Sequence, residues 1–519
     1  MNAPHDAQPR IAWTVAGSDS GGGAGLQADL RAFAAFNFHA CSVVAALTAQ
    51  NSVAVQRVEP VSVDLFSAQL SALTEDMPPA VIKTGMLGSA ANLQQLVRCI
   101  DHLRERDPGL PVVVDPVLRA TTGVDLADAA LLQAYITALL PRATLITPNR
   151  REAAVLLGRA ALDTQAAVED AAHALLLLGC KAVVITGGDE AGEHSEDYVV
   201  SEHASGWLSL PRVATKHQHG TGCVFASSAA AALALGFVTI EAIILAKMAT
   251  RHALRYGYAA GQGAGPVCPR PGFASSHDNL PQFSLSGQPT NPPFAPLIQP
   301  HLGLYAVVDS ATWVQRVLDG GVRTVQLRIK DPLHPGLRDE VRASIRAAKA
   351  VQAQLFINDH WQLAIEEGAY GVHLGQEDLA VADLAALARA GLRLGVSTHA
   401  YWEVCRAWRI KPSYIACGPI HPTQSKAMPW IAQGNGNLAY WCQLLPQPVV
   451  AIGGMDEARA TQAMQAGAAG VAVISAITAA ASPEIAIAAL QRALSGAAGA
   501  RSIEAPILPN ATLRGFVSR

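Results

Sequence analysis

Gln326-Leu327-Arg328-Ile329-Lys330 is the stretch that decides the fold of the second half of this chain. Side chains on a β-strand alternate between two faces, so Gln326, Arg328 and Lys330 point one way. Leu327 and Ile329 point the other way. Burying an amide and two cations without a partner is prohibitive, so the pattern predicts a multiply charged anion, such as a phosphate or diphosphate, as the guest. A solvated edge strand is the alternative for this segment taken alone.

The strand that holds this stretch is one of eight apolar runs in the second half, which alternate with Ala-rich segments of helical character. The runs are Leu304–Val308, Thr324–Ile329, Leu355–Asn358, Gly371–Leu374, Arg393–Ser397, Tyr414–Cys417, Pro448–Ile452 and Gly470–Ile474. Eight βα units predict a closed TIM (β/α)8 barrel over residues 300–498. In such a barrel the chemistry belongs at the C-terminal ends of the strands.

Two acidic residues follow consecutive strands at that end. Asp359 comes directly after the third strand, and Asp378 lies shortly after the fourth. Two carboxylates, with waters and a diphosphate, make an octahedral oxygen shell that suits Mg²⁺. We therefore predict that Asp359 and Asp378 hold magnesium. The alternative for Asp359 is that it caps the helix that follows.

Three loops at the same end add groups that bind anions. Gly453-Gly454, after the seventh strand, lets backbone N–H groups approach an anion, and the Ile474-Ser475 turn adds more at a helix N-terminus. The loop after the sixth strand, Gly418–Lys426, supplies two hydroxyls and the Lys426 ammonium. Hydroxyls position a phosphate and the ammonium offsets its charge. A solvated lysine is the alternative for Lys426 taken alone.

These residues lie in motifs that resemble the thiamine-phosphate synthase family, over essentially residues 300–490. In chain order the motifs are QLRIK (326–330), INDHWQLA (357–364), GVHLGQEDL (371–379), GVSTH (395–399), GPIHPTQSK (418–426), AIGGM (451–455) and GVAVISAI (470–477). That family couples a pyrimidine diphosphate to a thiazole phosphate and expels pyrophosphate. Cations placed where the leaving group develops its charge suit such a reaction.

The resemblance implies roles for individual residues at the barrel mouth. The pyrimidine diphosphate would be bound by Gln326, Leu327, Arg328, Ile329, Lys330, Asn358, Ser397 and Lys426, with Asp359 and Asp378 on Mg²⁺. The thiazole phosphate would be bound by Thr423, Gln424, Ser425, Gly454, Ile474 and Ser475. The family's loop usually reads Thr-x-Thr-Lys, so Ser425 is a departure, but one that keeps the hydroxyl.

The first half of the chain opens with a strand, Ile11–Ala16, followed by a Gly-rich turn, Gly17–Gly25, and a helix from Leu26. Glycines at a strand-to-helix turn admit close approach by a ligand. The spacing is neither the dinucleotide fingerprint G-x-G-x-x-G nor a phosphate-binding loop that ends in Lys-Ser/Thr. A tight turn that needs glycine only for packing is the alternative.

A second motif, His219-Gly220-Thr221-Gly222-Cys223, opens a long Ala-rich helix. Its backbone N–H groups and the helix dipole would form an anion hole for a phosphoryl group in transfer. We expect the helix N-terminus to lower the pKa of the Cys223 thiol, so that a thiolate accepts a proton. The alternative for Cys223 is a small, buried apolar side chain.

Four further motifs lie between these two, and three of them follow apolar runs, as ligand-binding residues do in a doubly wound sheet. They are LTAQN (47–51), IKTGM (82–86), VDPV (114–117) and TPNRRE (147–152). Over residues 10–270 the set is similar to the hydroxymethylpyrimidine and phosphomethylpyrimidine kinases of the ribokinase-like fold. The resemblance therefore implies a ribokinase-like doubly wound α/β/α sandwich with ATP as the phosphoryl donor.

The same resemblance implies site residues in the first half. Gly17, Gln50 and Met86 would contact the pyrimidine. Asn149 and Glu152 would hold Mg²⁺-ATP, and the catalytic set would be Gly220, Thr221, Gly222 and Cys223. The family usually shows Lys-Gly-Gly-His where this chain has Thr186-Gly187-Gly188-Asp189, so a cation near the ATP phosphates is missing. Lys216 is one substitute, and the effect on kinase activity stays open.

The composition of the sequence, and above all one Pro- and Ser-rich segment, divides the chain into domains and excludes some functions. A kinase domain over residues 1–270 and the barrel are joined by a Pro/Ser-rich linker, 271–299, and residues 499–519 form a weakly ordered tail. A net charge of −3 without basic clusters argues against nucleic acid. Eight scattered cysteines without a C-x-x-C pair, and no long apolar run, favour a cytoplasmic protein that does not enter a membrane.

The leading hypothesis is a bifunctional enzyme of thiamine biosynthesis with small-molecule substrates. The first half would phosphorylate hydroxymethylpyrimidine and then its monophosphate with ATP, and the barrel would condense the diphosphate with thiazole phosphate. The alternative is a pyridoxal-type vitamin kinase joined to a non-catalytic ligand-binding barrel. Substrate transfer between the domains, rates, side activity on pyridoxal and assembly into a homo-oligomer stay open.

Overall fold

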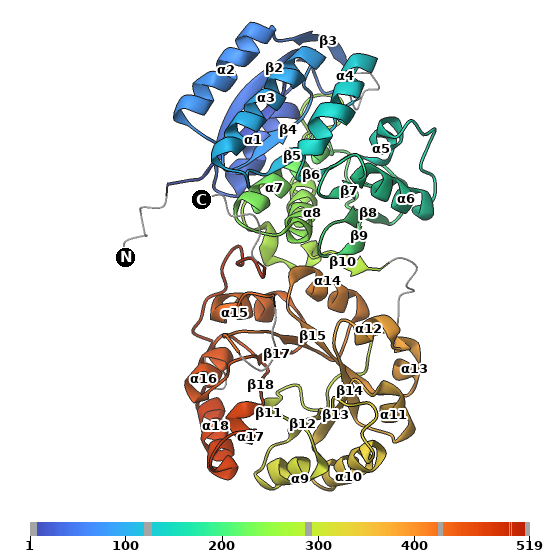
Figure 1. Cartoon of the computed structure of the whole chain (residues 1–519), viewed down its shortest axis with the longest axis vertical. Coiled ribbons are helices and arrows are strands. Elements are labelled where there is room, and N and C mark those ends of the chain that lie inside the picture. The colour runs from blue at the N-terminus through green and yellow to red at the C-terminus, as the bar shows by residue number, and fades with distance from the viewer. Residues whose placement is uncertain are drawn as a thin grey trace. The chain divides into compact units, whose positions relative to one another are not determined.

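The structure, a computed structural model, describes residues 8–118, 127–285, 293–423, 429–497, 499 and 501–513. The chain divides into two compact units, whose described parts are residues 8–285 and 293–513. Figure 1 labels their helices and strands along the chain. Each unit has its own sheet, so each is described by itself.

The first unit is built on one ten-stranded sheet in the order β10-β9-β8-β7-β6-β5-β4-β1-β2-β3. The strands are β1 (Ile11–Asp19), β2 (His39–Gln50), β3 (Val55–Pro60), β4 (Ile82–Thr84), β5 (Val112–Val114), β6 (Leu145–Ile146), β7 (Val183–Ile185), β8 (His194–Val200), β9 (Ser205–Pro211) and β10 (Gln282–Ser284). The central strands, from β2 through β1, β4, β5 and β6 to β7, are parallel, and the outer ones are antiparallel.

The central strands β4 to β7 are buried on both faces, because helices cover the sheet on each side. The helices are α1 (Gly25–Ala35), α2 (Val63–Asp76), α3 (Ala90–Arg106), α4 (Ala129–Ala134), α5 (Arg150–Leu156), α6 (Gln165–Leu176), α7 (Thr221–Ala234) and α8 (Thr239–Arg255), with the short turns η1 (Tyr135–Leu139), η2 (Leu140–Arg142), η3 (Phe273–Ser275) and η4 (His277–Asn279). The doubly wound α/β architecture predicted from the sequence is confirmed.

The second unit is a closed barrel of eight parallel strands in sequential order. They are β11 (Gly303–Val308), β12 (Thr324–Leu327), β13 (Gln354–Asn358), β14 (Gly371–Leu374), β15 (Arg393–Thr398), β16 (Tyr414–Cys417), β17 (Val449–Ile452) and β18 (Gly470–Val473). The eight predicted runs thus become eight strands, and the predicted TIM barrel is confirmed. Several strand boundaries differ from the prediction by one residue. The largest difference is that β12 ends at Leu327, so Arg328 to Lys330 lie in the loop that follows.

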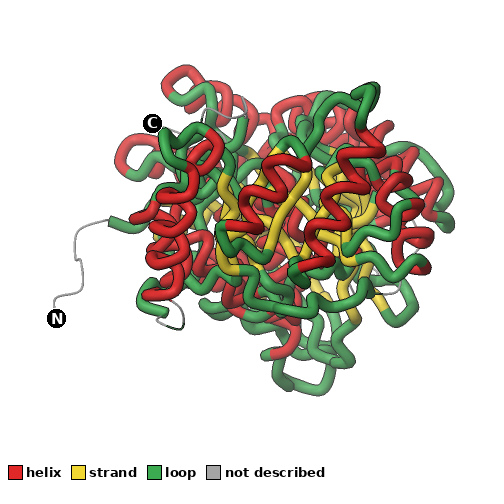
Figure 2. Tube along the Cα trace, turned by 90° about the horizontal axis from the view of Figure 1, so that it is seen from below, coloured by secondary structure: helices red, strands yellow, loops and turns green. Residues whose placement is uncertain are grey.

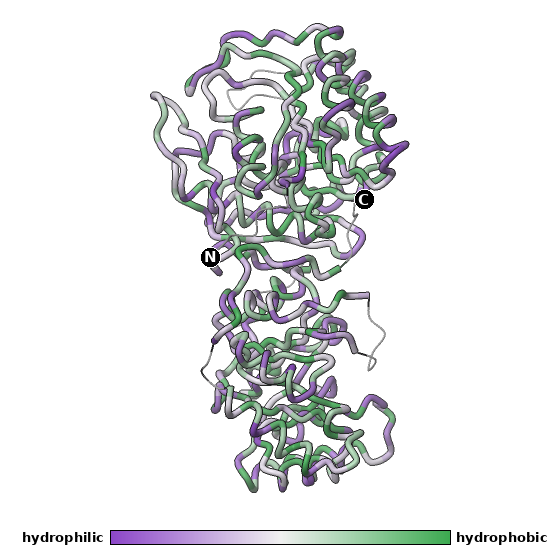
Figure 3. Tube along the Cα trace, turned by 90° about the vertical axis from the view of Figure 1, so that its left-hand side faces the viewer, coloured by the Kyte–Doolittle hydropathy of each residue, from purple (hydrophilic) through white to green (hydrophobic). Residues whose placement is uncertain are grey.

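Helices surround the barrel strands, as the labels in Figure 1 show, and Figure 2 colours helices red and strands yellow along the trace. They are α9 (Ala311–Asp319), α10 (Leu337–Ala350), α11 (Trp361–Glu366), α12 (Asp378–Val381), α13 (Leu384–Arg389), α14 (Tyr401–Ile410), α15 (Gly434–Leu444), α16 (Glu457–Gln465), α17 (Ser475–Thr478) and α18 (Pro483–Ala497). Apolar residues lie mainly in the strands and the helix faces that pack on them, and Figure 3 colours this hydropathy along the trace.

Aromatic side chains fill the barrel interior, and glycines on neighbouring strands make room for them. Tyr305, Phe356 and Tyr414 form one buried cluster. A Cβ at Gly371 would lie 2.7 Å from the Phe356 ring, and one at Gly395 would lie 2.1 Å from the Tyr414 ring. The interior is therefore a packed core that leaves the chemistry to the strand ends.

Two expectations about the ends of the domains are wrong. Much of the segment predicted as linker is ordered: β10 pairs with β9, and Phe294 is 6% exposed and donates its backbone N–H to Lys411. The described part of the predicted tail is ordered as well, because Asn510 exchanges two hydrogen bonds with Asn437 at 2.8 and 2.9 Å. Neither segment has a clear apolar periodicity, so the sequence did not predict that they pack against the domains.

Among the helices of the described residues, none joins the length and the apolar character that crossing a lipid bilayer requires.

Candidate active sites

A cavity of about 480 Å³ lies in the first unit at the carboxyl ends of the parallel strands. It brings together every site residue that was predicted for this half: Gly17, Gln50, Met86, Asn149, Glu152, Gly220, Thr221, Gly222 and Cys223. These residues come from strand ends and helix starts that are up to 206 positions apart, between Gly17 and Cys223. A cavity at this edge is where a doubly wound sheet binds its ligands.

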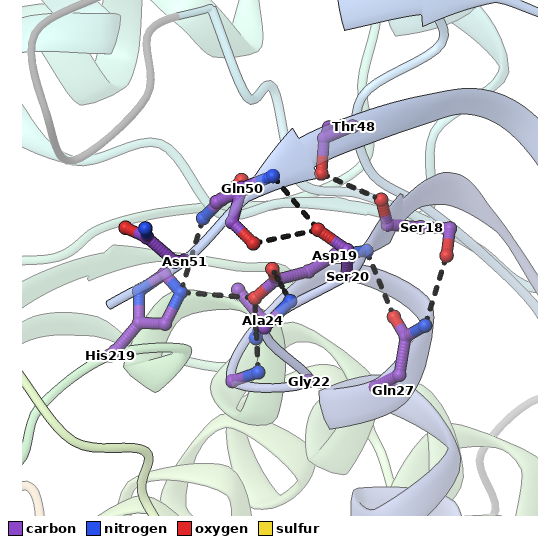
Figure 4. A network of polar contacts seen from close by, with 12 residues as sticks. Ser18, Asp19, Ser20, Gly22, Ala24, Gln27, Thr48, Gln50, Asn51 and His219 are labelled. Carbon is purple, nitrogen blue, oxygen red and sulfur yellow. Dashed lines mark hydrogen bonds and ion pairs between the residues drawn. The ribbon is translucent and has the colours of Figure 1, made fainter. Parts of the chain in front are cut away.

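The Gly-rich turn before α1 is folded around the carboxylate of Asp19, which is 4% exposed (Figure 4). Its oxygens accept backbone N–H bonds from Gly21 at 2.8 Å, Gly23 at 3.0 Å and Ala24 at 2.9 Å. Burial alone would raise the pKa of Asp19, but these bonds and one from His219 outweigh it and lower the pKa. The turn is therefore held by a buried, ionised carboxylate.

His219 joins the Gly-rich turn to the predicted anion hole and to the pyrimidine site. Its Nε2 lies 3.1 Å from Asp19 Oδ2 and 3.3 Å from Gln50 Nε2 (Figure 4). A Cβ on Gly23 would lie 2.3 Å from the His219 ring, so the turn packs directly on the imidazole. The contact was not predicted, because Asp19 and His219 are 200 residues apart.

The anion hole depends on one glycine. Gly220 is the N-cap of α7 and has φ 86° and ψ 7°, in the left-handed region that other residues avoid. A Cβ at Gly220 would lie 2.1 Å from the carbonyl oxygen of Gly23. Gly220 is thus required both by its backbone conformation and by close contact with the Gly-rich turn.

A buried ion cluster lies beneath the anion hole. The Lys83 ammonium, fully buried, contacts Asp29 at 2.9 Å and Asp115 at 3.5 Å. Asp29 also accepts hydrogen bonds from Thr14 at 2.6 Å and Ser227 at 2.8 Å, so its buried oxygens have donors. Lys83 remains a cation because these carboxylates outweigh its burial and raise its pKa. The cluster places the Lys83 ammonium close to Cys223, but the two carboxylates offset its charge.

The expectation that Cys223 has a lowered pKa is wrong. Its thiol lines the cavity and is partly exposed there. Burial by the surrounding protein nevertheless raises its pKa to about 12, although the Lys83 ammonium and a backbone bond from Gly25 act in the opposite direction. Cys223 is therefore a neutral thiol at pH 7 in this structure.

Asn149 and Glu152 lie together at the start of α5 and form a capping box. The Glu152 N–H donates to Asn149 Oδ1 at 2.9 Å, and the Asn149 N–H donates to Glu152 Oε2 at 3.0 Å. Burial and the nearby Asp115 carboxylate raise the pKa of Glu152 to about 8. Burial also raises the pKa of Asp115, to about 6. Two buried acids of raised pKa in one cavity form an environment in which a bound cation would be stabilised.

Among the cavity residues that were not predicted from the sequence are Asp197, Arg212 and Lys247. Lys247 contacts Asp197 at 2.7 Å, and Asp197 also accepts the Gly187 N–H at 3.0 Å. Arg212 donates to the carbonyls of Gly188 at 2.6 Å and Gly192 at 3.0 Å. Lys216, the substitute considered from the sequence, is exposed and does not line the cavity. Nothing in the local sequence distinguishes Arg212 from other surface arginines.

In the second unit the predicted residues lie at the C-terminal mouth of the barrel. Gln326 is in β12, Asn358 ends β13 and Ser397 is in β15. Gly454 and Ser475 follow β17 and β18, and Ile474 is the N-cap of α17. Gln424, Ser425 and Lys426 lie outside the described residues.

The cationic stretch of the opening motif continues the strand alternation beyond the end of β12. Arg328 is half-buried and Lys330 exposed, while Leu327 and Ile329 are 1% and 7% exposed. Their buried apolar side chains leave only the backbone of Leu327 and Ile329 for a ligand. His360 Nε2 lies 2.8 Å from the carbonyl oxygen of Ile329 and so ties this loop to the next one.

Asp359 and Asp378 share a hydrogen bond between their side chains. Burial, and then the Asp378 carboxylate, raise the pKa of Asp359 to about 6. The alternative that Asp359 caps the next helix is not seen, because His360 is the N-cap of α11 and no side chain makes the cap bond. Asp359 has φ 63°, a backbone conformation that is unusual for residues other than glycine.

The glycine pair after β17 lies against the loop after β16. Gly453 and Gly454 have φ of 102° and 64°. A Cβ at Gly454 would lie 2.5 Å from the carbonyl oxygen of Pro422, next to Thr423. The two loops that were predicted to hold the thiazole phosphate are therefore neighbours at the mouth.

The folds and sites together define a two-domain enzyme, in which a small-molecule kinase fold is joined to a phosphate-binding barrel. The family model described as phosphomethylpyrimidine kinase matches residues 19–268, and the one described as thiamine monophosphate synthase matches residues 304–477. A probable thiamine biosynthetic bifunctional enzyme of Oryza sativa subsp. japonica is 36% identical over 468 residues, which are 88% of this chain and 82% of that protein. The chain belongs to this family of bifunctional thiamine biosynthetic enzymes.

Single-domain proteins match each half. A thiamine-phosphate synthase of Serratia proteamaculans is 53% identical over 199 residues, covering 38% of this chain and 94% of that protein. The crystal structure of an ADP complex of Bacillus subtilis pyridoxal kinase is 32% identical, covers 50% of this chain and 97% of that chain, and has a TM-score of 0.46. The barrel half thus corresponds to a protein that occurs alone.

Proposed function

We propose that the first unit phosphorylates hydroxymethylpyrimidine and then its monophosphate with ATP, and that the barrel condenses the product with thiazole phosphate. The observation that carries the proposal is the single cavity that joins Gln50 and Met86 to Asn149, Glu152 and the α7 N-terminus. Such a cavity accommodates an acceptor alcohol and a phosphoryl donor together.

For the kinase we propose that positioning and fixed charge carry the reaction. Gln50 and Met86 contact the pyrimidine, and the N–H groups at the start of α7 stabilise the phosphoryl group in transfer. The buried Lys83 ammonium is offset by Asp29 and Asp115, so the N–H groups and the helix dipole carry the stabilisation. Cys223 is a neutral thiol in this structure, and bound phosphates would disfavour its thiolate further. We therefore propose that the transfer does not depend on a strong base at this position, since phosphoryl transfer demands little from a base.

For the barrel we propose Mg²⁺ between Asp359 and Asp378. Within the described residues no group of three or more His, Cys, Asp or Glu side chains could hold a metal. Two neighbouring carboxylates are nevertheless a fitting pair for Mg²⁺, which usually binds one or two carboxylates and takes its other oxygens from water and phosphate. The ion would offset the charge of the departing pyrophosphate, which Arg328 and Lys330 also face.

The pKa of Asp359 gives this assignment a pH dependence. A carboxyl whose pKa is raised to about 6 in the fold stabilises the metal-free fold when protonated, and that stability is lost as the pH rises through 6. Mg²⁺ replaces the proton, so we expect it to raise the barrel's thermal unfolding midpoint at pH 7 and little at pH 5. Differential scanning calorimetry measures both. Equal shifts at the two pH values would argue against the pair as the metal site.

We propose that Arg212 supplies the cation that the Thr186-Gly187-Gly188-Asp189 sequence lacks. Its guanidinium holds the loop 188–194 over the cavity next to Asp189. Arg212→Met should raise the KM for ATP about tenfold, because a hydrogen bond to a charged group contributes about 1.5–3 kcal/mol. Lys216→Met is the matched control and should leave that KM unchanged. If only Lys216→Met raised the KM for ATP, Lys216 and not Arg212 would be the cation near the ATP phosphates.

The substrate of the kinase is tested by turnover of two alcohols. We expect phosphate transfer from ATP to hydroxymethylpyrimidine and to its monophosphate, with pyridoxal turned over far less efficiently. A kcat/KM for pyridoxal above that for the pyrimidine would overturn the assignment.

All eight cysteines are free thiols, which supports our proposal that the protein works in the cytoplasm.

A further inference from the structure

Five side chains inside the barrel form one continuous hydrogen-bonded chain from β12 to β15. Gln326 Nε2 lies 3.2 Å from the Tyr305 hydroxyl, which lies 2.7 Å from the Tyr414 hydroxyl. His373 Nδ1 lies 2.7 Å from the Tyr414 hydroxyl, and His373 Nε2 lies 2.7 Å from Ser397 Oγ. Both ends, Gln326 and Ser397, are proposed ligand contacts. The three middle residues have no role in the reaction as described so far.

The middle of the chain is sterically fixed. Tyr305, Tyr414 and His373 are 1%, 0% and 7% exposed. The His373 ring stacks on the Tyr414 ring with centroids 5.7 Å apart. Gly395 leaves the space that the Tyr414 ring occupies, since a Cβ there would lie 2.1 Å from it. These groups therefore cannot turn to other partners, and each buried donor has to be satisfied within the chain.

The available hydrogen-bond donors give the hydrogen-bonded chain of side chains one direction of donation. If the Gln326 amide donates to Tyr305, the Tyr305 O–H donates to Tyr414 and the Tyr414 O–H donates to His373 Nδ1. The remaining imidazole proton then lies on Nε2 and donates to Ser397 Oγ. With the amide in this orientation, the reverse direction would leave the Tyr305 hydrogen without an acceptor.

The direction decides what the two ends present to a ligand. Ser397 accepts from His373, so its own O–H is free to donate outward. Gln326 donates an amide N–H to the Tyr305 hydroxyl, so its side-chain carbonyl oxygen is free to accept a hydrogen bond from a ligand. A diphosphate has only acceptor oxygens, whereas an aminopyrimidine also carries an amino donor. The reverse direction would turn Ser397 lone pairs toward the anion, which repels it.

We infer that Tyr305, Tyr414 and His373 are positioning residues for the barrel reaction, which set Ser397 to donate to the pyrimidine diphosphate and Gln326 to accept from it. The inference rests on the proposed assignment of Gln326 and Ser397 to that substrate. It adds a buried relay of hydrogen bonds that fixes their polarity without touching the ligand.

The direct test is the tautomer of His373 in the full-length protein, read by ¹⁵N NMR of histidine-labelled enzyme with His373→Gln as the assignment control. We expect the proton on Nε2. A proton on Nδ1 would overturn the inference, because the chain would then run the other way.

The kinetic test separates positioning from folding. Tyr414→Phe should raise the KM for the pyrimidine diphosphate about tenfold and leave the KM for thiazole phosphate unchanged. Tyr401→Phe removes a buried hydroxyl between α14 and α15 instead, and should change neither constant. His373→Gln, which keeps an N–H donor for Ser397, should bind the diphosphate better than His373→Leu. Equal loss in both His373 variants, or an unchanged KM in Tyr414→Phe, would contradict the inference.

Failure of the proposed function gives a different result. If the wild-type protein does not condense the two phosphates at all, the substrate assignment is wrong. If the wild type is active and His373 carries its proton on Nδ1, only the positioning role is wrong.

Discussion

Replacing Gly220 by alanine is expected to lower kcat of both kinase steps by about a hundredfold to a thousandfold, which is the cost of losing an anion-hole donor. The added Cβ would lie 2.1 Å from the Gly23 carbonyl oxygen, and φ of 86° is unfavourable for alanine. The chain must therefore move the N-terminus of α7 away from the Gly-rich turn. Steady-state phosphorylation of hydroxymethylpyrimidine and of its monophosphate measures the loss.

Gly236→Ala is the matched control for this variant. Gly236 follows α7 at its other end and has φ of 93°, but a Cβ there would meet nothing within 4 Å. It should cost about 1 kcal/mol of stability and leave the kinase unchanged. Condensation from supplied diphosphate should be normal in both variants. A fully active Gly220→Ala enzyme would show that the α7 N-terminus is not the anion hole.

The double variant Asp359→Asn, Asp378→Asn is expected to lose about a thousandfold of the condensation rate, since a bound metal supplies several kcal/mol of charge stabilisation. Asparagine tolerates the φ of 63° at position 359, so the loop should keep its shape. Kinase activity should not change. The measurement is the rate of thiamine phosphate formation from the two phosphates at saturating Mg²⁺.

Asp383→Asn provides the comparison for the double variant. Its side chain accepts the Ala386 N–H and caps α13, a bond that asparagine also makes. It should condense at the wild-type rate. Retention of condensation in the double variant would show that Asp359 and Asp378 do not hold a magnesium ion that the reaction needs.

The barrel could be predicted because each of its strands is recognisable from a short stretch of sequence. Each strand is a short apolar run, and the polar residue at its end, such as Asn358 or Ser397, occupies the position that the fold uses for chemistry. The Gly-rich turn and the motif at 219–223 were predicted for the same reason, since glycine marks a required backbone conformation. The fold determines which strand ends meet, so residues from distant motifs line one cavity.

The remaining features depend on contacts between distant residues. Three such features join different strands or helices: the Asp19–His219 bond, the Lys247–Asp197 pair and the Tyr305–Tyr414–His373 chain. The spacing of these residues in the sequence does not predict that they are in contact. The raised pKa of Cys223 has the same origin, because burial by neighbouring elements opposes the local effect of the helix start. The Pro-rich segment before residue 300 was misjudged because strand β10 has only three residues.

The most direct measurement incubates the full-length protein with hydroxymethylpyrimidine, Mg²⁺-ATP and thiazole phosphate and follows products by mass spectrometry. We expect pyrimidine monophosphate, then diphosphate, then thiamine phosphate with release of pyrophosphate. Accumulation of the diphosphate without thiamine phosphate, or no phosphorylation of the pyrimidine, would contradict the assignment of two successive activities to this one chain.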